Sequence, residues 1–577
     1  MTPVHPALPL FVAAALMGLV RPTSRGPIAL AGAIAALTAV VGLPAPAELQ
    51  ATLLGFDLRL IAADELSRLF ALILAVMAGL GTLYALHVER GGEHAATSVY
   101  AGASLGVVLA GDWVTLFLFW ELMAISSTAV VWHGGGGRAR AAGFRYLFVH
   151  LASGALLLTG ILMLHATGTD LLGPVPPGAA FWLLLAGIAI NAAIPPLHAW
   201  LTDAYPEASV TGSVFLSAFT TKTAVYVLIR TFPGAEPLIW AGVAMALFGV
   251  VYAVLENDIR RLLAYHIVSQ VGYMVAGVGM GTALALNGAA AHAFCHILYK
   301  ALLFMGAGAV LHATGRRKLT ELGGLAPRMK AVVVLYMVGA LSISGAPLFN
   351  GFVSKSMVVS AAAVGGWPVL ELLLTLASVG TFLHTGLKLP YFTFFGPPAA
   401  GIEPRPLPRN MLAAMGAAAA LCVGLGLFPG WLYARLPFDA GYAPYTLDHV
   451  VSAMQLLLGT GAAFALLLPK LRGQPTITLD TDWIYRRPLR RAAAATVAGA
   501  ATAGRRLEGA GAAVVRAAAA VASDPVRGFA SLQSWVEGGA SEELRSTGYD
   551  PDRYRLPVGA IVLWAVAALG VTALLLR

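Results

Sequence analysis

Long apolar stretches recur along this 577-residue sequence, separated by short polar segments. A helix that crosses the hydrocarbon core of a bilayer needs about 20 apolar residues, which most of these stretches approach. Charged residues make up 11% of the chain, whereas a soluble domain carries about 25%. We therefore expect an all-α, polytopic membrane protein of about sixteen helices. They are expected at 7–20, 27–43, 66–86, 96–110, 113–131, 143–165, 179–199, 210–230, 238–255, 261–281, 286–312, 331–360, 368–395, 409–429, 450–469 and 557–576.

Basic residues are concentrated in alternate loops between these helices, and the intervening loops are nearly free of them. The positive-inside rule places such loops in the cytoplasm. We expect a multi-pass protein of the bacterial cytoplasmic (inner) membrane, surrounded by lipid, with both termini on the outer side. The net charge of +9 follows from this topology, and without a binding motif it predicts no nucleic-acid partner. The residues that set the pattern are Arg138, Arg140, Arg260, Arg261, Arg316, Arg317, Lys318, Arg328 and Lys330.

The tract at 484–546 differs from the rest, because alanine-rich stretches alternate there with arginines. Its basic residues and scattered valines and leucines predict an amphipathic helix along the cytoplasmic surface, which glycine and serine residues should interrupt. A disordered basic linker is the alternative interpretation.

Ionisable side chains also lie inside the apolar stretches, where each costs about 2.5–3.5 kcal/mol on the insertion scale. Glu121 is central in LFLFWELMAIS, and Lys222 is central in VFLSAFTTKTAVYVLI. A carboxylate and an amine that approach each other in a low dielectric change each other's proton affinity, so ion binding at one can displace a proton at the other. The alternative is a fixed ion pair that holds two helices together.

Three titratable residues repeat at helical spacing in AHAFCHILYKALLF, namely His292, His296 and Lys300. They span about 12 Å of one helix face, which water or hydroxyl groups can bridge into a proton wire. A two-histidine zinc site is a competing interpretation, but no adjacent glutamate or obvious third ligand accompanies them. Haem would need axial histidines that face each other from separate helices. We expect no metal, no cofactor and no catalytic chemistry of the chain's own.

Helix-breaking residues interrupt two of the apolar stretches. Pro195 and Pro196 precede His198 and Asp203 in one, and SGAPLFNGFVSK ends at Lys355 in the other. Broken helices at membrane depth expose backbone groups that must line a cavity or be buried in protein. Helix-end hydrogen bonding explains His198 and Asp203 as well as a relay does. The two interruptions predict inverted repeats and this organisation: N-terminal helices 1–95, repeats 96–230 and 238–395, peripheral helices 409–469, lateral segment 470–556 and final helix 557–577.

Jointly, these motifs resemble the antiporter-like subunits of respiratory complex I and of Mrp-type sodium/proton antiporters, most closely the Mrp D subunit or the distal complex I member. The resemblance covers about 96–395 and is carried by FWELM, PLHAWLTDAY, TKTAVY, DIRRLLAYHIVSQVGYM, HAFCHILYKALLF and GFVSK. It implies two inverted five-helix half-channels joined through a central hydrophilic axis. The residues that it implies as a proton relay are Glu121, Lys222, His292, His296, Lys300 and Lys355, with Asn191, His198, Asp203 and His266 as accessory residues.

One departure from the family pattern concerns Asn191, which stands where the family has a lysine that pairs with the glutamate at Glu121. We expect the first half-channel to depend instead on Lys222, to conduct differently or not to conduct at all. A second departure, Thr202 in place of a proline, should only soften the helix break. The resemblance implies a proton-translocating subunit that works with other membrane subunits, with sodium as a candidate second ion. An Mrp-type antiporter is the favoured host complex; a complex I-like NADH-quinone oxidoreductase, a membrane hydrogenase and an inorganic-carbon-uptake complex are the alternatives.

Overall fold

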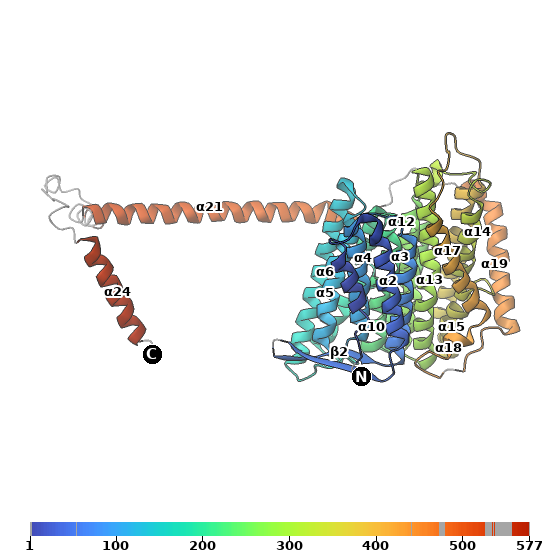
Figure 1. The fold of residues 1–577 in the computed structure, drawn as a ribbon, viewed down its shortest axis with the longest axis horizontal. Coiled ribbons are helices and arrows are strands. Elements are labelled where there is room, and N and C mark those ends of the chain that lie inside the picture. Colours follow the sequence, from blue (N-terminus) through green and yellow to red (C-terminus); the bar gives the residue numbers. More distant parts are fainter. Residues whose placement is uncertain are drawn as a thin grey trace. The chain divides into compact units, whose positions relative to one another are not determined.

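The computed structural model describes residues 3–53, 55–439, 441–471, 479–524, 534, 536 and 557–575. It divides into two compact units, Met1–Asp482 and Trp483–Arg577, which are described separately. Unit 1 is a bundle of helices that run side by side (Figure 1). Eleven of the described helices are long and apolar enough to cross a membrane, and further apolar helices are shorter.

The helices of unit 1 follow the predicted apolar stretches closely. In chain order they are α1 (Leu8–Leu16), α2 (Pro22–Val41), α3 (Glu65–Tyr84), α4 (Gly91–Leu109), α5 (Trp113–Trp132), α6 (Gly136–His165), α7 (Ala179–Asn191), α8 (Ala199–Ala204), η1 (Tyr205–Glu207), α9 (Gly212–Ala218), α10 (Thr220–Thr231), α11 (Pro237–Leu255), α12 (Ile259–Met280), α13 (Ala283–Thr314), η2 (Leu319–Glu321), α14 (Lys330–Ser344), α15 (Asn350–Val364), α16 (Pro368–Thr381), η3 (Phe382–Lys388), η4 (Tyr391–Phe395), α17 (Arg409–Leu427), α18 (Gly430–Tyr433), α19 (Leu447–Leu467) and η5 (Leu468–Lys470).

Local sequence determines where the central helices begin and end. Asp112 and Asp258 cap α5 and α12, and Thr282 caps α13, each through a side-chain oxygen that accepts from a backbone amide of the first turn. Gly281 and Gly315 end α12 and α13 in the left-handed conformation that glycine adopts without a steric penalty. These capping residues explain why the observed ends of α5, α12 and α13 lie close to the predicted ones.

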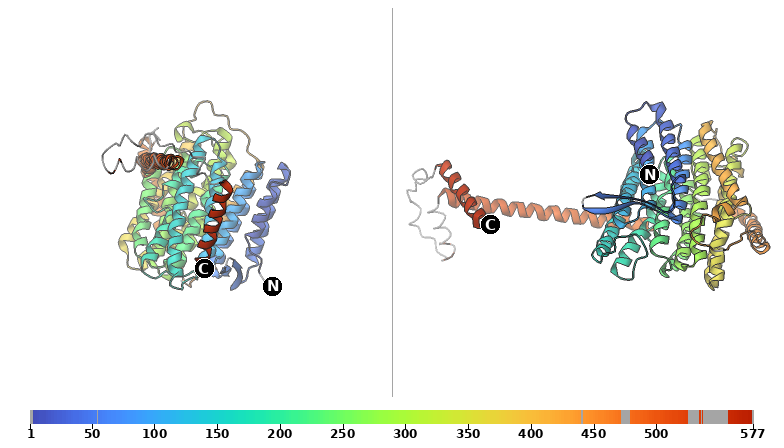
Figure 2. Two further views of the ribbon diagram at one scale, coloured as in Figure 1. Left: turned by 90° about the vertical axis from the view of Figure 1, so that its left-hand side faces the viewer. Right: turned by 60° about the horizontal axis from the view of Figure 1, so that its bottom comes forward.

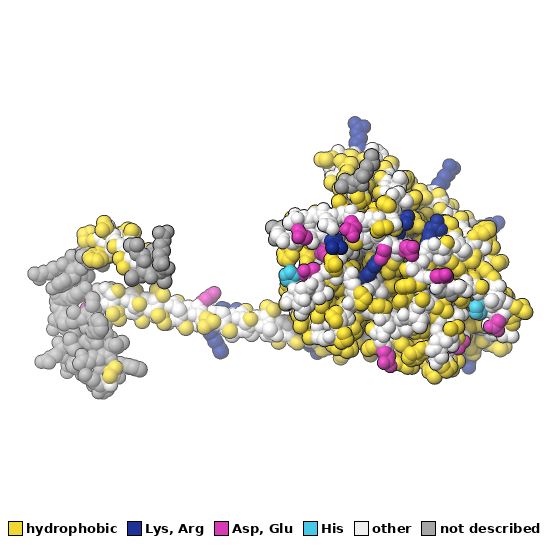
Figure 3. Space-filling model, turned by 90° about the horizontal axis from the view of Figure 1, so that it is seen from below, with side chains coloured by type: hydrophobic (Ala, Val, Ile, Leu, Met, Phe, Trp, Pro, Cys, Tyr) yellow, Lys and Arg dark blue, Asp and Glu magenta, His cyan; other side chains and the backbone are white. Residues whose placement is uncertain are grey.

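A β-hairpin interrupts the helical pattern near the N-terminus, which the sequence analysis did not predict. Strand β1 (Ala47–Leu53) pairs antiparallel with β2 (Phe56–Ala63), with a register irregularity between Leu49 and Gln50. The hairpin lies across the end of the bundle at which the chain begins (Figures 1 and 2). Charged side chains of both signs gather on this end face (Figure 3).

Two helices of the bundle are broken at corresponding places in the two halves. The chain leaves the helical path after α7 at 192–198 and again between α14 and α15 at 345–349. Among the described residues other than glycine, only Ala193 (φ 59°) and Leu348 (φ 75°) have positive φ angles, and each lies in one of the breaks. The predicted single helix at 331–360 is therefore two helices, because Gly345 ends the first in the left-handed conformation.

The most deeply buried helices lie at the centre of the bundle. Every residue in the apolar windows of α9–α10 and of α12 is buried, as is 94% of that of α13. A helix that is buried all round is surrounded by other helices rather than by lipid. The ionisable residues Lys222, His266 and Lys300 lie on these central helices, so protein and not lipid surrounds their side chains.

Unit 2 contains the long helix α21 (Pro488–Ser523) and the apolar helix α24 (Val558–Leu575), while α20 (Asp482–Arg486) starts at the boundary. At 100° per residue, Leu489, Val497, Leu507 and Val514 fall on one face of α21, and most of its arginines fall on the other. The helix is continuous, contrary to the interruptions expected from its glycines. Most of the predicted lateral segment beyond Asp524 lies outside the described residues.

Candidate functional site

The predicted line of residues on α13 is buried in the middle of the bundle. His292, His296 and Lys300 are fully inaccessible to solvent. His292 Nδ1 lies 3.2 Å from Ser354 Oγ of α15. Within the described part of the chain, neither ring nitrogen of His296 nor the Lys300 ammonium has a hydrogen-bond partner. No group of three or more His, Cys, Asp or Glu side chains among the described residues is arranged to hold a metal ion.

Three other buried lysines share one arrangement, in which the ammonium group meets a carbonyl at the C-terminal end of a helix. Lys222 Nζ donates to Ser217 O at the end of α9 (2.5 Å), and Lys355 Nζ donates to Ile343 O at the end of α14 (2.7 Å). The last carbonyls of a helix lack intrahelical partners and carry the negative end of the helix dipole. Helix ends inside the bundle therefore hold these cations, and the end that holds Lys355 is the one at the second break.

The third such lysine, Lys388, was missed by the sequence analysis together with His384. Both lie on η3, a π-helical turn that continues α16. Lys388 Nζ donates to Val254 O (2.5 Å) and Glu256 O (3.3 Å) at the end of α11. His384 Nδ1 lies 3.0 Å from His266 Nε2 of α12, so a single proton joins the two imidazoles. Lys388 stood close to the end of its apolar stretch, which gave no signal that it is buried.

These groups form a continuous neighbourhood across four helices. Lys222 lies close enough to His292 and His296 for their charges to interact, and Lys300 likewise interacts with His266 and His384. The structure thus brings the second-half residues together at the centre of the bundle. It also adds His384, which meets His266, and Lys388, which bonds carbonyls at the end of α11.

A cavity of about 480 Å³ adjoins Lys355 between α15, α16 and α19. Its wall carries the hydroxyls of Ser356, Ser360 and Ser378, and Lys355 Nζ lies 3.4 Å from Ser378 Oγ. Glu371 and His449 also line it. Lys355 therefore has beside it a hydroxyl-lined space that can hold water.

In the first half, Asn191 contacts a histidine that the sequence analysis did not single out. His150 Nδ1 of α6 donates to Asn191 Oδ1 at 2.8 Å, and both side chains are buried. Glu121 of α5 faces Gly154, one turn along α6 from His150, and a Cβ at Gly154 would collide with Glu121 Oε1. The carboxylate thus lies beside the helix that carries His150, and that histidine supplies a titratable group near the position where the family has a lysine.

Hydroxyl groups join the helix of Glu121 to the helix of Lys222. Tyr146 Oη donates to Ser127 Oγ of α5 at 3.0 Å and lies 3.4 Å from Thr220 Oγ1 of α10. Thr220 is in turn 2.6 Å from Tyr100 Oη. Among the described residues no hydrogen bond or ion pair joins Glu121 to Lys222 directly, so the predicted coupling of these two residues would have to run through intervening polar groups.

The accessory residues His198 and Asp203 form ion pairs at the arginine-rich end of the bundle. The Arg145 guanidinium donates two hydrogen bonds, of 2.6 and 2.9 Å, to the carboxylate of Asp203. His198 Nε2 lies 3.2 Å from the buried carboxylate of Asp480, which also accepts from Tyr265 Oη at 2.7 Å. Burial alone would raise the pKa of Asp480, but the hydrogen bonds from His198 and Tyr265 hold it below the usual value. The segment after α19 is thereby anchored at the first helix break.

Comparison with known proteins identifies the family to which this fold belongs. The family model described as NADH:quinone oxidoreductase/Mrp antiporter, TM, matches residues 110–381. NADH-quinone oxidoreductase subunit N of Desulforudis audaxviator is 33% identical over 346 residues, which cover 56% of this chain and 68% of that protein. The chain belongs to this family.

Two further proteins extend the likeness within the NADH:quinone oxidoreductase/Mrp antiporter family. The D subunit of the Na(+)/H(+) antiporter of Alkalihalophilus pseudofirmus is 33% identical over 283 residues, covering 44% of this chain and 56% of that one. A chain of the Mrp complex from Dietzia sp. DQ12-45-1b superposes with a TM-score of 0.65 and 25% identity, covering 80% of this chain and 98% of that one. The predicted family and its all-α, multi-pass membrane fold are confirmed.

Proposed function

We propose that this chain carries protons across a bacterial cytoplasmic membrane as one subunit of a multisubunit complex. Protons pass along Lys222, His296 and Lys300 to the pair His266 and His384, with His292 and Lys355 as a branch toward the hydroxyl-lined cavity. The repeats 96–230 and 238–395 act as two half-channels. Measurements of proton transport, with Lys300→Ala as the decisive variant, test this proposal.

The observation that carries the proposal is the unpaired state of Lys300 and His296. Lys222, Lys355 and Lys388 each have a carbonyl partner, so helix capping alone would account for them. Lys300 has no such partner among the described residues, and an unpaired ammonium ion in a dry protein interior is very unfavourable. A lysine that gains and loses a proton, with water as its transient partner, resolves this difficulty, whereas a structural role does not.

The host complex that we favour is a cation/proton antiporter of the Mrp type, since the chain is similar to an Mrp chain over 80% of its length. A redox-driven complex is the second candidate, because a relative of 33% identity is named as a quinone oxidoreductase subunit. Mass spectrometry of the intact complex, purified in mild detergent, separates the two. Partner subunits with nicotinamide, flavin or iron–sulfur sites would exclude the antiporter.

The bundle ends differ in charge, and this difference supports the orientation in the membrane that we propose. The loops at the end opposite the hairpin hold the arginines of the predicted cytoplasmic loops, while acidic residues outnumber basic ones in the loops at the hairpin end. The positive-inside rule then places the hairpin outside and α21 in the cytoplasm.

Site-directed labelling tests this orientation. Both native cysteines are buried, so introduced cysteines can be labelled selectively. In intact cells, a membrane-impermeant maleimide should label Gln50→Cys in β1 but not Ala512→Cys in α21, and both positions are exposed. Lysed cells provide the control, because both variants should then react. Labelling of Ala512→Cys alone in intact cells would show that the topology is inverted.

The hydrogen bond between Asn191 and His150 makes a prediction about the first half-channel. Asn191→Lys places an ammonium ion beside His150. Its positive charge opposes protonation of the His150 imidazole, because a protonated imidazole is also positively charged. We expect the pH profile of transport to shift toward lower pH, with a comparable amount of assembled protein. Transport against pH for wild type, Asn191→Lys and Glu121→Gln checks this. Three identical profiles would exclude an ion-carrying role for the first half.

A further inference from the structure

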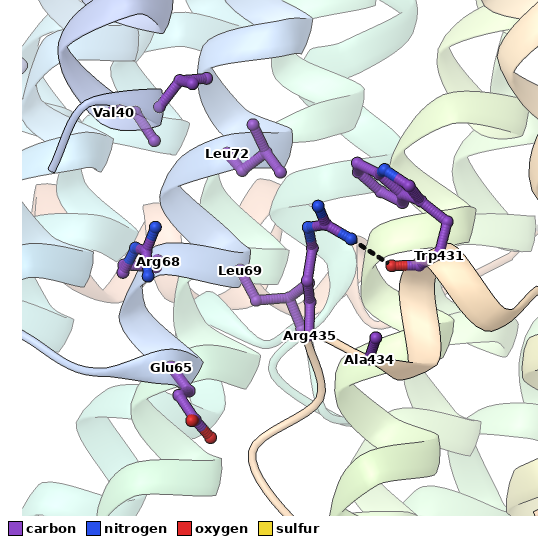
Figure 4. A pocket seen from close by; sticks show the side chains of 9 residues that line it. Val40, Glu65, Arg68, Leu69, Leu72, Trp431, Ala434 and Arg435 are labelled. Carbon is purple, nitrogen blue, oxygen red and sulfur yellow. Dashed lines mark hydrogen bonds between the residues drawn. The ribbon is translucent and has the colours of Figure 1, made fainter. Parts of the chain in front are cut away.

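A second cavity lies at the hairpin end of the bundle, separate from the cavity beside Lys355. It has a volume of about 560 Å³ and lies between the end of α2, the first two turns of α3 and the segment around α18 (Figure 4). None of its lining residues takes part in the site described above. Its walls combine arginines with apolar side chains, whereas a simple packing defect inside a bundle would be lined by apolar side chains alone.

Two arginines flank the cavity from opposite sides. Arg68 projects from α3 and Arg435 from the chain just after α18 (Figure 4). The Arg435 guanidinium stacks on Trp431, 4.0 Å from the ring centroid, and Nη1 donates to Trp431 O at 2.6 Å. The side chain of Arg68 makes no hydrogen bond or ion pair with any residue that the structure describes. Glu65 is the single carboxylate of the lining, so the cavity carries an excess of positive charge.

The position of the cavity matches the boundary between headgroups and hydrocarbon. Its polar residues come from the start of α3, where a spanning helix meets the membrane surface, and Trp431 is the type of residue enriched at that level. Along the same wall, Val41 of α2 is 63% exposed and Leu72 lies one turn deeper than Arg68. An apolar track therefore leads from the two arginines toward the middle of the bilayer.

We propose that this cavity binds an anionic phospholipid. The phosphodiester is held between Arg68 and Arg435, whose planar guanidinium groups suit bidentate contacts to phosphate oxygens. An acyl chain lies along Val41 and Leu72. A carboxylate from a neighbouring subunit would satisfy the arginines but not the apolar track, and a free anion such as phosphate would leave that track exposed to solvent.

Native mass spectrometry of the full-length protein in detergent tests the proposal. The probe is dioctanoyl-phosphatidylglycerol, with dioctanoyl-phosphatidylcholine and inorganic phosphate as the comparison ligands. Wild type is compared with Arg68→Gln, Arg435→Gln and the double variant. Arg405→Gln is the matched control, because Arg405 is an exposed arginine at the opposite end of the bundle.

We expect one saturable phosphatidylglycerol adduct per wild-type chain and per Arg405→Gln chain. Each cavity variant should bind about tenfold more weakly, as loss of a charge-assisted hydrogen bond implies. Phosphatidylcholine and phosphate should not displace the adduct. Equal binding by the double variant would overturn the proposal, as would displacement by phosphate, which would identify a free-anion site. Cross-linking of the Arg68→Cys variant to a partner subunit would show that protein fills the cavity.

Discussion

Lys300→Ala is expected to reduce proton transport by about a hundredfold or more while the protein still inserts and assembles. Loss of a group that gives and takes a proton typically costs that much in rate. The native ammonium has no protein partner among the described residues, so its removal leaves no hydrogen-bonding group unsatisfied. The measurement is dissipation of a pH gradient by inverted membrane vesicles, with the amount of assembled protein determined in parallel.

The matched control for this variant is Lys330→Ala. Lys330 is an exposed lysine at the start of α14, so its removal changes the net charge equally without touching the relay. We expect the control to transport like wild type. If Lys300→Ala transported protons at the rate of Lys330→Ala, the relay assignment would be wrong and Lys300 would have a packing role alone.

Lys355→Ala should have a loss of similar size for a different reason. This lysine lies beside the cavity of about 480 Å³ and 5.5 Å from the centre of the Tyr273 ring, which lies 5.7 Å from the His292 ring of α13. Without its ammonium, the relay loses its titratable group beside that space. The carbonyl of Ile343 loses its partner, but water from the adjacent cavity can replace it. Assembly should therefore survive. Inverted vesicles again provide the measurement.

Ser356→Ala is the control for the cavity. Ser356 lines the same space, but its hydroxyl donates to the backbone of its own helix, 2.6 Å from Phe352 O, whereas the Lys355 ammonium bonds Ile343 O and Ser378 Oγ. Its transport should stay within about twofold of wild type, as expected for loss of one local hydrogen bond. A Lys355→Ala variant that retained full transport would show that protons leave the α13 line by another route.

The sequence was most informative where the relevant residues share one helix. The repeat at positions 292, 296 and 300 places three groups on one face through helix geometry alone, and the structure keeps them there. The breaks were similarly visible, because proline and glycine act locally on the backbone. From the sequence we could predict that a charged side chain lies near each break, but not which backbone carbonyl it would bond.

Contacts between distant segments were not predictable from the local pattern. His384 meets His266 across 118 positions in the chain, and His198 meets Asp480 across 282. These pairs depend on which helix faces pack together, which no periodicity within one segment reveals. His150 was missed for a different reason, because a lone histidine in an apolar stretch is more often an ordinary core residue.

Two elements differ from what the sequence pattern led us to expect. The β-hairpin was not predicted, although apolar and polar residues alternate along Ala47–Leu53 as in a half-buried strand. Helix α21 contains several glycines, each of which costs about 1 kcal/mol relative to alanine, yet it runs unbroken for 36 residues. Its many alanines outweigh that cost.

The most direct measurement of the central claim is proton flux through the purified complex in liposomes under an imposed membrane potential. A potassium gradient with valinomycin drives the flux, and a trapped pH-sensitive dye reports it. The account predicts that wild type conducts protons, whereas the double variant Lys300→Ala/Lys355→Ala does not exceed the leak of protein-free liposomes. Equal flux through wild type and double variant would contradict it, because protons would then cross without the side chains that the structure gathers at the centre of the bundle.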